Sequence, residues 1–388
     1  MSEWKECIIA NLGEVVGGAT PSTKKPENYE NGDISWITPK DLSTFRGRYI
    51  LRGERNITEI GLNSCSTRLL PPNTVLFSSR APIGYVAIAA KEMCTNQGFK
   101  SVIPNTDTDF MFLYYLLKYN RDNIENMGSG TTFNEVSGNT MKSIKVCVPV
   151  DIDEQRRIGA VLSAIDDKIE LNTAINENLE QQAQALFKNL IADIHERVPF
   201  TSVIQVLGGG TPKTGKQEYW NGEIPFFTPK DVGTSYVLTT EKNITPLGLD
   251  NCNSRLYPVN TVFLTARGTV GKVSLAGVPM SMNQSCYALA GKDGLHQIIV
   301  YHYVLETVKA LKHKASGAVF DAIITRDFDT ESVPALSSEQ IDSFIAVAEP
   351  IYSDILNRTI ENQRLAALRD TLLPKLMNGE IDVSAVQI

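Results

Sequence analysis

The chain has 388 residues, of which 42% are hydrophobic and 21% are charged, and its formal net charge is −7. This length exceeds what one ordinary domain needs, so two or more globular units are expected. No apolar run approaches the roughly 18–20 residues of a membrane span and the first residues are polar, which predicts a soluble protein that is not exported. The six cysteines form no Cys-x-x-Cys pair, which excludes a zinc knuckle or a redox motif and favours reduced thiols in a cytoplasmic protein.

The excess of acidic side chains is confined to two segments. Residues 1–150 hold 16 Lys and Arg against 15 Asp and Glu, and residues 193–336 hold 13 against 13. Residues 151–192 and residues 337–388 each hold 4 against 8. A nucleic-acid partner usually requires a basic footprint, which the net charge alone argues against. The two neutral blocks keep such a partner open, because the acidic segments need not touch it.

Residues 1–150 are expected to form one domain that mixes helices and strands. Gly, Pro, Thr and Asn separate short β-branched runs such as residues 74–77, a pattern typical of strands joined by tight turns, and a helix is predicted over residues 109–120. Loops dense in hydrogen-bonding side chains lie between the strands. The candidate binding residues in this block are Thr20, Ser22, Lys24, Lys25, Lys40, Arg80, Asn96 and Gln97.

Two kinds of side chain in these loops suit the recognition of bases. Arg80 ends a strand before a Gly turn, where a bidentate contact with guanine or phosphate is possible. The amides of Asn96 and Gln97 have the donors and acceptors that read adenine. A fold-stabilising arginine and a buried amide network are the structural alternatives, and the sequence leaves both open.

Residues 151–192 are predicted to form one long helix with a single apolar stripe. The helix opens on the capping-box pattern Asp151-x-x-Glu154 and contains neither Gly nor Pro after Gly159. Its stripe steps by alternating fours and threes, which indicates a heptad seam. The seam positions are Ile158, Leu162, Ile165, Ile169, Asn172, Asn176, Leu179, Ala183, Leu186 and Leu190.

Residues 193–336 repeat the first block at a separation of about 187 residues. Residues 17–21 correspond to 208–212 and residues 38–41 to 228–231, and a helix is predicted over 297–312. Two copies are too few for a solenoid, so a duplicated domain in a two-lobed protein fits better. The candidate binding residues of this copy are Thr211, Lys213, Thr214, Lys216, Lys230, Arg267, Asn283 and Gln284.

Residues 337–388 repeat the long helix, which opens on the capping-box pattern Ser337-x-x-Gln340. Asn176 and Asn362 occupy the same step of the two seams, and a polar residue there fixes register and partner, so the helices are expected to pair through these residues. Connectivity makes the pair antiparallel. We therefore predict an α/β (α+β) fold with two pseudo-symmetric domains separated by two long antiparallel coiled-coil helices of roughly 60 Å.

Several catalytic interpretations fail on their own residues. Residues 210–216 satisfy G-x-x-x-x-G-K, but Gln217 stands where a phosphate loop needs Ser or Thr. Residues 70–73 reverse the order of an amino-methyltransferase motor motif, and no glycine-rich cofactor motif precedes them. The four histidines lack ligand partners at useful spacing, and Asp41 and Asp231 are better explained as turn caps than as a catalytic pair.

Over essentially its full length the chain resembles the specificity subunits of type I restriction-modification enzymes. The motifs that carry the resemblance are Trp4 with 12–14, the segments 38–41 and 228–231, the turns 80–84 and 267–271, the helix start 154–158, the segment 166–172, and the closing segment 372–381. The second helix start, residues 338–341, lacks the arginine pair of the first, and the second seam contains Arg358 and Arg369, so the two partner-docking surfaces need not be equivalent.

The resemblance implies target recognition domains at 1–150 and 193–336, each with a small twisted sheet. It also implies a central conserved spacer helix at 151–192 and a C-terminal one at 337–388. It implies a non-catalytic chain that binds double-stranded DNA at a bipartite site, together with two methyltransferase subunits and optionally two restriction/translocase subunits. No cofactor is expected in this chain, whereas S-adenosylmethionine is expected in the partner methyltransferase. The alternatives are a stand-alone DNA methyltransferase and a purely structural coiled-coil scaffold.

Overall fold

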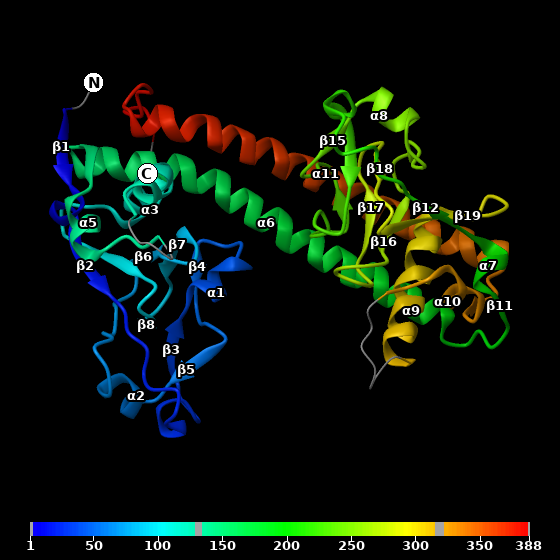
Figure 1. The fold of residues 1–388 in the computed structure, drawn as a ribbon, viewed down its shortest axis with the longest axis horizontal. Coiled ribbons are helices and arrows are strands. Elements are labelled where there is room, and N and C mark those ends of the chain that lie inside the picture. The colour runs from blue at the N-terminus through cyan, green and yellow to red at the C-terminus, as the bar shows by residue number, and fades with distance from the viewer. Residues whose placement is uncertain (1–2, 129–133, 315–321, 387–388) are drawn as a thin grey trace. The chain divides into compact units, whose positions relative to one another are not determined.

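The computed structural model describes residues 3–128, 134–314 and 322–386. The chain forms two compact units, and each is described by itself (Figure 1). Unit 1 comprises Met1–Glu170 and Arg364–Ile388, and unit 2 comprises Leu171–Gln363. The two longest helices, α6 (Ile152–Ile191) and α11 (Ser338–Met377), therefore each contribute one stretch to each unit.

Unit 1 is built on a five-stranded sheet. Its strands, in spatial order, are β2 (Gly13–Gly17), β9 (Lys100–Pro104), β6 (Val75–Ser79), β7 (Ile83–Ala89) and β4 (Tyr49–Ile50). A second sheet contains β5 (Arg55–Ile57), β3 (Ile34–Ile37) and β8 (Cys94–Thr95), and a two-stranded pair contains β1 (Trp4–Ile8) and β10 (Lys145–Pro149). All neighbours are antiparallel except β4 with β7 and β3 with β8.

Unit 2 repeats this topology strand for strand. Its five-stranded sheet contains β12 (Ile204–Gly208), β19 (Cys286–Gly291), β16 (Val262–Thr265), β17 (Val273–Ala276) and β14 (Tyr236–Val237). The smaller sheets contain β15 (Asn243–Ile244), β13 (Trp220–Phe227) and β18 (Ser281–Met282), and β11 (Arg197–Pro199) and β20 (Ser332–Pro334). The parallel pairs again fall at equivalent places, β14 with β17 and β13 with β18. The predicted duplication and the mixed α/β class are confirmed.

The five-stranded sheet of each unit is buried on both faces. Val75 and Phe77 pack in one core cluster of unit 1 while Leu76, between them, packs in another. In unit 2, Val262 and Phe263 divide between two clusters in the same way. This alternation follows from the period of two along a strand. It leaves the strand ends and loops to present side chains to solvent.

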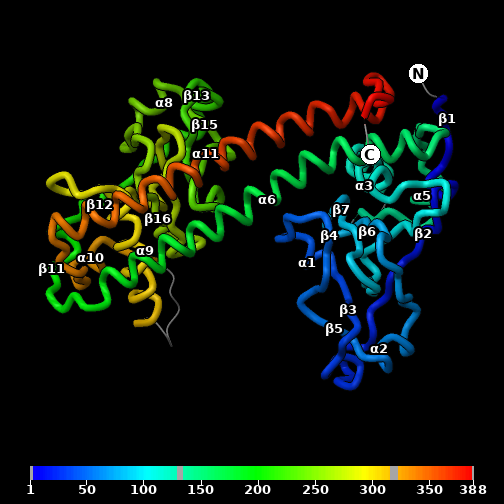
Figure 2. Tube along the Cα trace, turned by 180° about the vertical axis from the view of Figure 1, so that it is seen from behind, coloured from blue at the N-terminus to red at the C-terminus, as the bar shows by residue number. Residues whose placement is uncertain are grey.

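The predicted domain helices are confirmed. Helix α3 (Phe110–Tyr119) begins at Asp109, whose carboxylate accepts the amide hydrogen of Phe112 at 2.8 Å, and its counterpart is α9 (Gln297–Lys314) (Figure 2). No helix among the described ranges is both long and apolar enough to cross a membrane. The shorter helices are η1 (Ile9–Asn11), η2 (Pro26–Asn28), α1 (Pro39–Ser43), α2 (Glu59–Asn63), α4 (Arg121–Asn126), α5 (Gly138–Ser143), α7 (Phe200–Val203), η3 (Gln217–Tyr219), α8 (Pro246–Asp250) and α10 (Thr325–Asp329).

The two long helices begin differently. At the start of α11, the Ser337 amide donates to Gln340 at 2.9 Å and the Gln340 amide donates to the Ser337 hydroxyl at 3.2 Å, so the predicted capping box is complete. At the start of α6, the Asp151 carboxylate accepts the amide hydrogen of Asp153 at 3.0 Å, two residues ahead, and one carboxylate oxygen of Glu154 is buried without a hydrogen-bond partner. This cap differs from the predicted box, in which the Asp151 side chain would accept from Glu154 three residues ahead.

The predicted seam of α6 holds only along part of the helix. Ile158, Leu162 and Ala183 are fully buried as expected, whereas Leu186 is 40% exposed and Phe187, outside the predicted seam, is 1% exposed. A straight helix has 3.6 residues per turn and drifts away from a strict heptad. Near its C-terminal end α6 packs against its own domain through α9, so the buried stripe follows the domain and not the heptad.

Each domain is fastened to a long helix through its own central helix. In unit 1, the Tyr115 hydroxyl of α3 donates to Asp166 of α6 at 2.7 Å. In unit 2, the equivalent contact joins His302 of α9 to the Tyr352 hydroxyl of α11 at 3.1 Å. Both contacts are buried, so they fix the orientation of each domain on its helix within the unit.

Candidate nucleic-acid interface

The loop between β2 and β3 presents the first set of predicted residues. Ser22, Lys24 and Lys25 are exposed and Thr20 is partly exposed. Two hydrogen bonds to its backbone stabilise the loop. The Asn28 side-chain amide donates to the Ser22 carbonyl at 3.0 Å, and the Tyr29 hydroxyl donates to the Pro21 carbonyl at 2.6 Å. Its lysines are therefore carried by a loop of defined shape, as a surface that recognises a ligand requires.

The equivalent loop of unit 2 lies between β12 and β13. Thr211, Lys213, Thr214 and Lys216 are all exposed. The indole of Trp220 donates to the Lys213 carbonyl at 3.3 Å, which anchors this loop as Tyr29 anchors the first. The loop leads into the three-residue helix η3 and not into an α-helix, which agrees with the rejection of a phosphate loop.

Lys216 lies near one carboxylate and one aromatic ring. Its ammonium lies 3.4 Å from Glu218 and 5.1 Å from the centre of the Tyr219 ring. Hydrogen bonds to Tyr219 and Glu218 raise the pKa of Lys216, so the side chain stays protonated. A partner phosphate has to replace an exposed, weak ion pair there.

The predicted Asn-Gln pairs divide into two roles. Asn96 accepts the amide hydrogen of Gly98 at 2.8 Å and Asn283 accepts that of Ser285 at 3.0 Å, so both asparagines cap their own turns. Gln97 and Gln284 are exposed, and each accepts a hydrogen bond from a loop threonine, Thr20 and Thr211 respectively. The structure thus joins predicted residues that lie 77 and 73 positions apart in sequence.

The two predicted arginines are not in equivalent surroundings. Arg80 lies 3.6 Å from Glu135, which also accepts from Lys100 at 3.3 Å. Arg267 is exposed, and its backbone forms a bridge with Ala322. Glu135 and Lys100 were not singled out from the sequence, because no local pattern links them to Arg80.

The predicted lysines after β3 and β13 sit beside carboxylates. Lys40 and Glu54 form an ion pair of 2.7 Å, and Lys230 and Glu241 form one of 3.4 Å. Both lysine side chains are 77% exposed, so these pairs contribute little to stability and remain available to another partner.

The aspartates that follow these lysines are structural. The carboxylate of Asp41 accepts from the backbone and hydroxyl of Thr38, both at 2.7 Å, and from the Glu54 amide at 2.7 Å. Asp231 makes the same set of bonds in unit 2. The interpretation of both residues as turn caps is confirmed.

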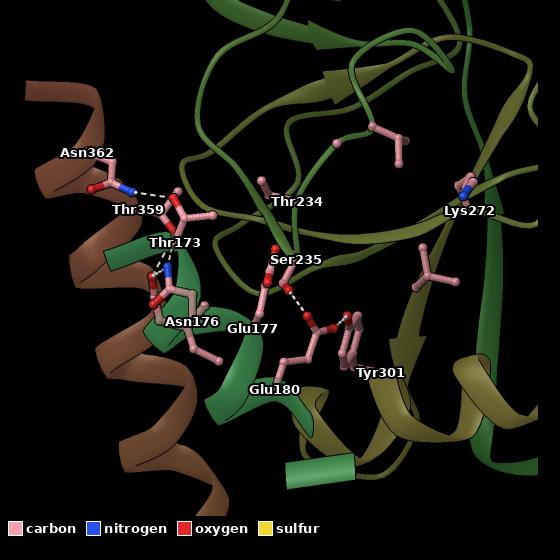
Figure 3. A pocket seen from close by; sticks show the side chains of 14 residues that line it. Thr173, Asn176, Glu177, Glu180, Thr234, Ser235, Lys272, Tyr301, Thr359 and Asn362 are labelled. Carbon is pink, nitrogen blue, oxygen red and sulfur yellow. Dashed lines mark hydrogen bonds between the residues drawn. The ribbon is translucent and has the colours of Figure 1, made fainter. Parts of the chain in front are cut away.

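Asn176 and Asn362 both contact the opposite long helix within unit 2, but they do not bond to each other. Asn176 donates to the Ile355 carbonyl and to the Thr359 hydroxyl, both at 3.3 Å. Asn362 accepts from Asn172 at 2.9 Å. It also donates to Thr173 at 3.3 Å (Figure 3). As the residue numbers of the contacts rise along α6, from Asn172 to Asn176, those of their partners fall along α11, so the helices are antiparallel here. The two helices thus contact each other through both predicted asparagines, and the register places Asn172 opposite Asn362.

Beside this polar layer, α6, α11 and the domain of unit 2 enclose a pocket of about 490 Å³ (Figure 3). Glu180 projects from α6 and accepts from the Ser235 hydroxyl at 2.5 Å and from the Tyr301 hydroxyl at 2.8 Å. Burial raises the pKa of Tyr301 well above its ordinary value, so this hydroxyl stays a donor. These contacts attach the domain to α6 and leave the loops described above free.

Groups that hold metals or perform acid–base chemistry are scarce. Within residues 3–128, 134–314 and 322–386, no cluster of three or more His, Cys, Asp or Glu side chains is arranged to hold a metal ion. His302 is buried and stacks on Phe187 with ring centroids 4.6 Å apart. Burial lowers its pKa to about 3, so it is a neutral core residue.

Comparison with known proteins identifies the class to which this arrangement belongs. The profile of the family described as "Type I restriction modification DNA specificity domain" matches residues 1–181 and 196–344, one match for each copy of the repeat. The chain therefore belongs to this family.

Individual relatives cover nearly the whole chain. It is similar to the specificity subunit of the type I restriction enzyme MjaIX of Methanocaldococcus jannaschii, with 31% identity over 98% of this chain and 94% of that protein. It is also similar to the specificity subunit of the type I enzyme HindI of Haemophilus influenzae, with 23% identity over 98% and 92%. The crystal structure of a type I restriction-modification S subunit from M. genitalium has the same fold, with a TM-score of 0.59, 16% identity and coverage of 97% and 96%.

Proposed function

We propose that this chain is the DNA-sequence-recognition subunit of a type I restriction-modification complex, with each domain reading one half of a bipartite double-stranded site. One observation carries the proposal: both copies of the family domain keep one scaffold and differ in the loop side chains that the scaffold presents. A common scaffold with variable loops is how one fold serves different recognition tasks.

The exposed loop residues have the chemistry that base recognition needs. Lysine and arginine recognise guanine and phosphate, hydroxyls contact either, and amides read adenine in the major groove. The first loop offers Lys24 and Lys25 in succession, whereas the second offers Lys213 and Lys216 around Thr214. Two different patterns on one scaffold favour two different half-sites.

We assign catalysis to partner subunits. Two methyltransferase subunits, with their S-adenosylmethionine, would modify adenine in each half-site, and two restriction/translocase subunits join in complexes that cleave. The negative net charge and the neutral domains leave many phosphate contacts to be supplied by partners, so the isolated chain should bind DNA weakly and the assembled complex tightly. This function is exercised in the cytoplasm, where the DNA lies. Neither a stand-alone methyltransferase nor a structural scaffold has support among the relatives.

The test is to express the chain with its methyltransferase partner and map the methylated bases of the host genome. Replacing Lys213, Thr214 and Lys216 together by Ala should relax one half-site and leave the other intact. Each lost base contact should cost about 1–3 kcal/mol of discrimination.

The matched variant replaces Ser22, Lys24 and Lys25 by Ala in the first loop. It should affect only the opposite half-site. If either variant changes base preferences in both half-sites, or if the unaltered complex methylates no defined sequence, the proposed function is wrong.

A further inference from the structure

The Thr-Gln pair is the same in both domains although the loops around it differ. Thr20 donates to Gln97 in unit 1, and Thr211 donates to Gln284 in unit 2. Both glutamines are exposed. Among the five loop positions that follow the threonines, two carry different side chains in the two copies, Ser22 against Lys213 and Lys24 against Gly215, whereas the Thr-Gln contact is the same.

The turn that carries each glutamine is fixed from two sides. Asn96 and Asn283 close the turns by accepting the amide hydrogens two residues ahead. A Cβ atom on Gly18 would lie 2.2 Å from the Asn96 carbonyl oxygen, and one on Gly209 would lie 2.2 Å from that of Asn283. Only glycine permits this approach, which brings the loop threonine onto the glutamine.

In each domain the threonine hydroxyl donates a hydrogen bond to the side-chain carbonyl oxygen of the glutamine. The amide nitrogen of the same side chain has two hydrogens to donate, and the side chain belongs to an exposed residue. Each domain therefore presents a fixed, uncharged donor at the base of its lysine-bearing loop. Basic side chains that surround a neutral donor favour an anionic acceptor.

A contact made by identical side chains in identical geometry cannot distinguish two different half-sites. It has to meet a feature that both halves share, which is either the phosphate backbone or the adenine modified in each half, and the basic side chains of the same loop favour the phosphate. We infer that Gln97 and Gln284 each donate to a DNA phosphate and set the position of their domain on its half-site, while the neighbouring loop residues choose the bases. The inference rests on the proposed function and adds this division of labour to it.

The experiment uses the complex of the full chain with its methyltransferase subunits. Binding is measured on duplexes that carry the methylated site, and on duplexes in which a single phosphate of one half-site is replaced by an uncharged methylphosphonate. Gln97→Ala and Gln284→Ala should each weaken binding by about tenfold, and by similar factors, because a hydrogen bond to a charged group is lost. The methylated sequence should stay the same.

The methylphosphonate series locates the contact. One substitution in the half-site read by unit 1 should weaken the unaltered complex and have no further effect on Gln97→Ala, whereas the same substitution in the other half should still weaken that variant. Gln182→Ala, a change on the surface of α6, is the matched control and should bind as the unaltered complex does.

Three outcomes overturn the inference. A changed base preference in one half-site means that the glutamine reads a base. Loss of the methyltransferase subunits from the purified complex means that it contacts protein. Unchanged binding by both variants means that it contacts neither. Each of these leaves the proposed function standing, because the unaltered complex still prefers a defined sequence in all three.

Discussion

The two units fasten their domains at the same place with opposite chemistry. In unit 1 the contact is ionic: Asp166 accepts from Tyr115 at 2.7 Å and pairs with Arg369 at 2.7 Å, and the buried Arg48 bonds to Glu170 at 3.1 Å and to Asp167. Burial, with Asp166 beside the hydroxyl, raises the pKa of Tyr115 well above its ordinary value, so it donates throughout.

The equivalent place in unit 2 is aromatic and uncharged. His302 meets the Tyr352 hydroxyl at 3.1 Å, stacks on Phe187, and lies edge-on to Phe344 with centroids 5.3 Å apart. Duplication has thus preserved where the domain and helix meet, and not which interaction joins them. At this place unit 1 has paired charges and unit 2 has a neutral histidine, although Glu180 also attaches the domain of unit 2 to α6.

The largest expected effect comes from the aromatic contact. Phe187→Ala should destabilise unit 2 by about 3–5 kcal/mol, because it empties the centre of a packed cluster. Hydrogen–deuterium exchange followed by mass spectrometry should show faster exchange in unit 2 and unchanged exchange in unit 1. Leu186→Ala, at the adjacent exposed position, should change little; equal losses from the two variants would contradict the burial pattern.

The ionic contact should be next in size. Arg48→Ala should destabilise unit 1 by about 2–3 kcal/mol, because Asp167 and Glu170 lose a partner that is only 5% exposed while they themselves stay partly solvated. Chemical denaturation, followed by hydrogen–deuterium exchange in unit 1, measures this loss of stability. Arg48→Lys keeps the charge and should recover only part of the loss, since an ammonium does not reproduce the planar guanidinium contacts; full recovery would reduce the contact to charge alone.

The stability of unit 2 should fall in acid because of one buried histidine that has no counterpart in unit 1. Burial lowers the pKa of His302 to about 3 in the folded chain, whereas in the unfolded chain the same imidazole has a pKa near 6.5. Between these two pH values the unfolded chain therefore binds a proton that the folded chain does not bind. The contribution of His302 is fully present above pH 6.5 and is lost as the pH falls toward 3, by about 2 kcal/mol at pH 5. In a variant that keeps Trp220 as its only tryptophan, the fluorescence of that residue reports on the unfolding of unit 2. His302→Phe should flatten the pH dependence between pH 7 and 5, and an unchanged slope would rule out this histidine as its source.

The smallest expected effect concerns the helix starts. Ser337→Ala breaks a complete capping box and should cost about 1 kcal/mol. Glu154→Gln at the start of α6 should leave the capping of that helix unchanged, because the Asp151 carboxylate accepts the Asp153 amide hydrogen without Glu154. Thermal unfolding of both variants tests the contrast, and a loss of helix at the start of α6 in Glu154→Gln would restore the sequence-based capping box.

The sequence predicted the fold well because the repeat supplied two independent copies of each turn and strand. It also placed Thr20 and Gln97 among the candidates, but their bond spans 77 residues and no local period reports it. The same holds for Arg80 with Glu135 and for Arg48 with α6. Phe187 was missed because a heptad count assumes that a long helix packs only on another helix. The sequence thus predicted elements and exposed loops, whereas side-chain partners depended on tertiary packing.

The division of the chain into units has a consequence for its synthesis. Unit 2 is one uninterrupted stretch, Leu171–Gln363, whereas unit 1 needs the last residues of the chain, since Leu376 and Val383 lie in its core and Gly379 packs against Trp4. Domains fold as units while the ribosome is still adding residues. Unit 2 can therefore complete its core before unit 1, which waits for the final turns of α11 although its first residues leave the ribosome earliest. A chain that stopped before Leu376 would contain every residue of unit 2, whereas the core of unit 1 would lack Leu376 and Val383.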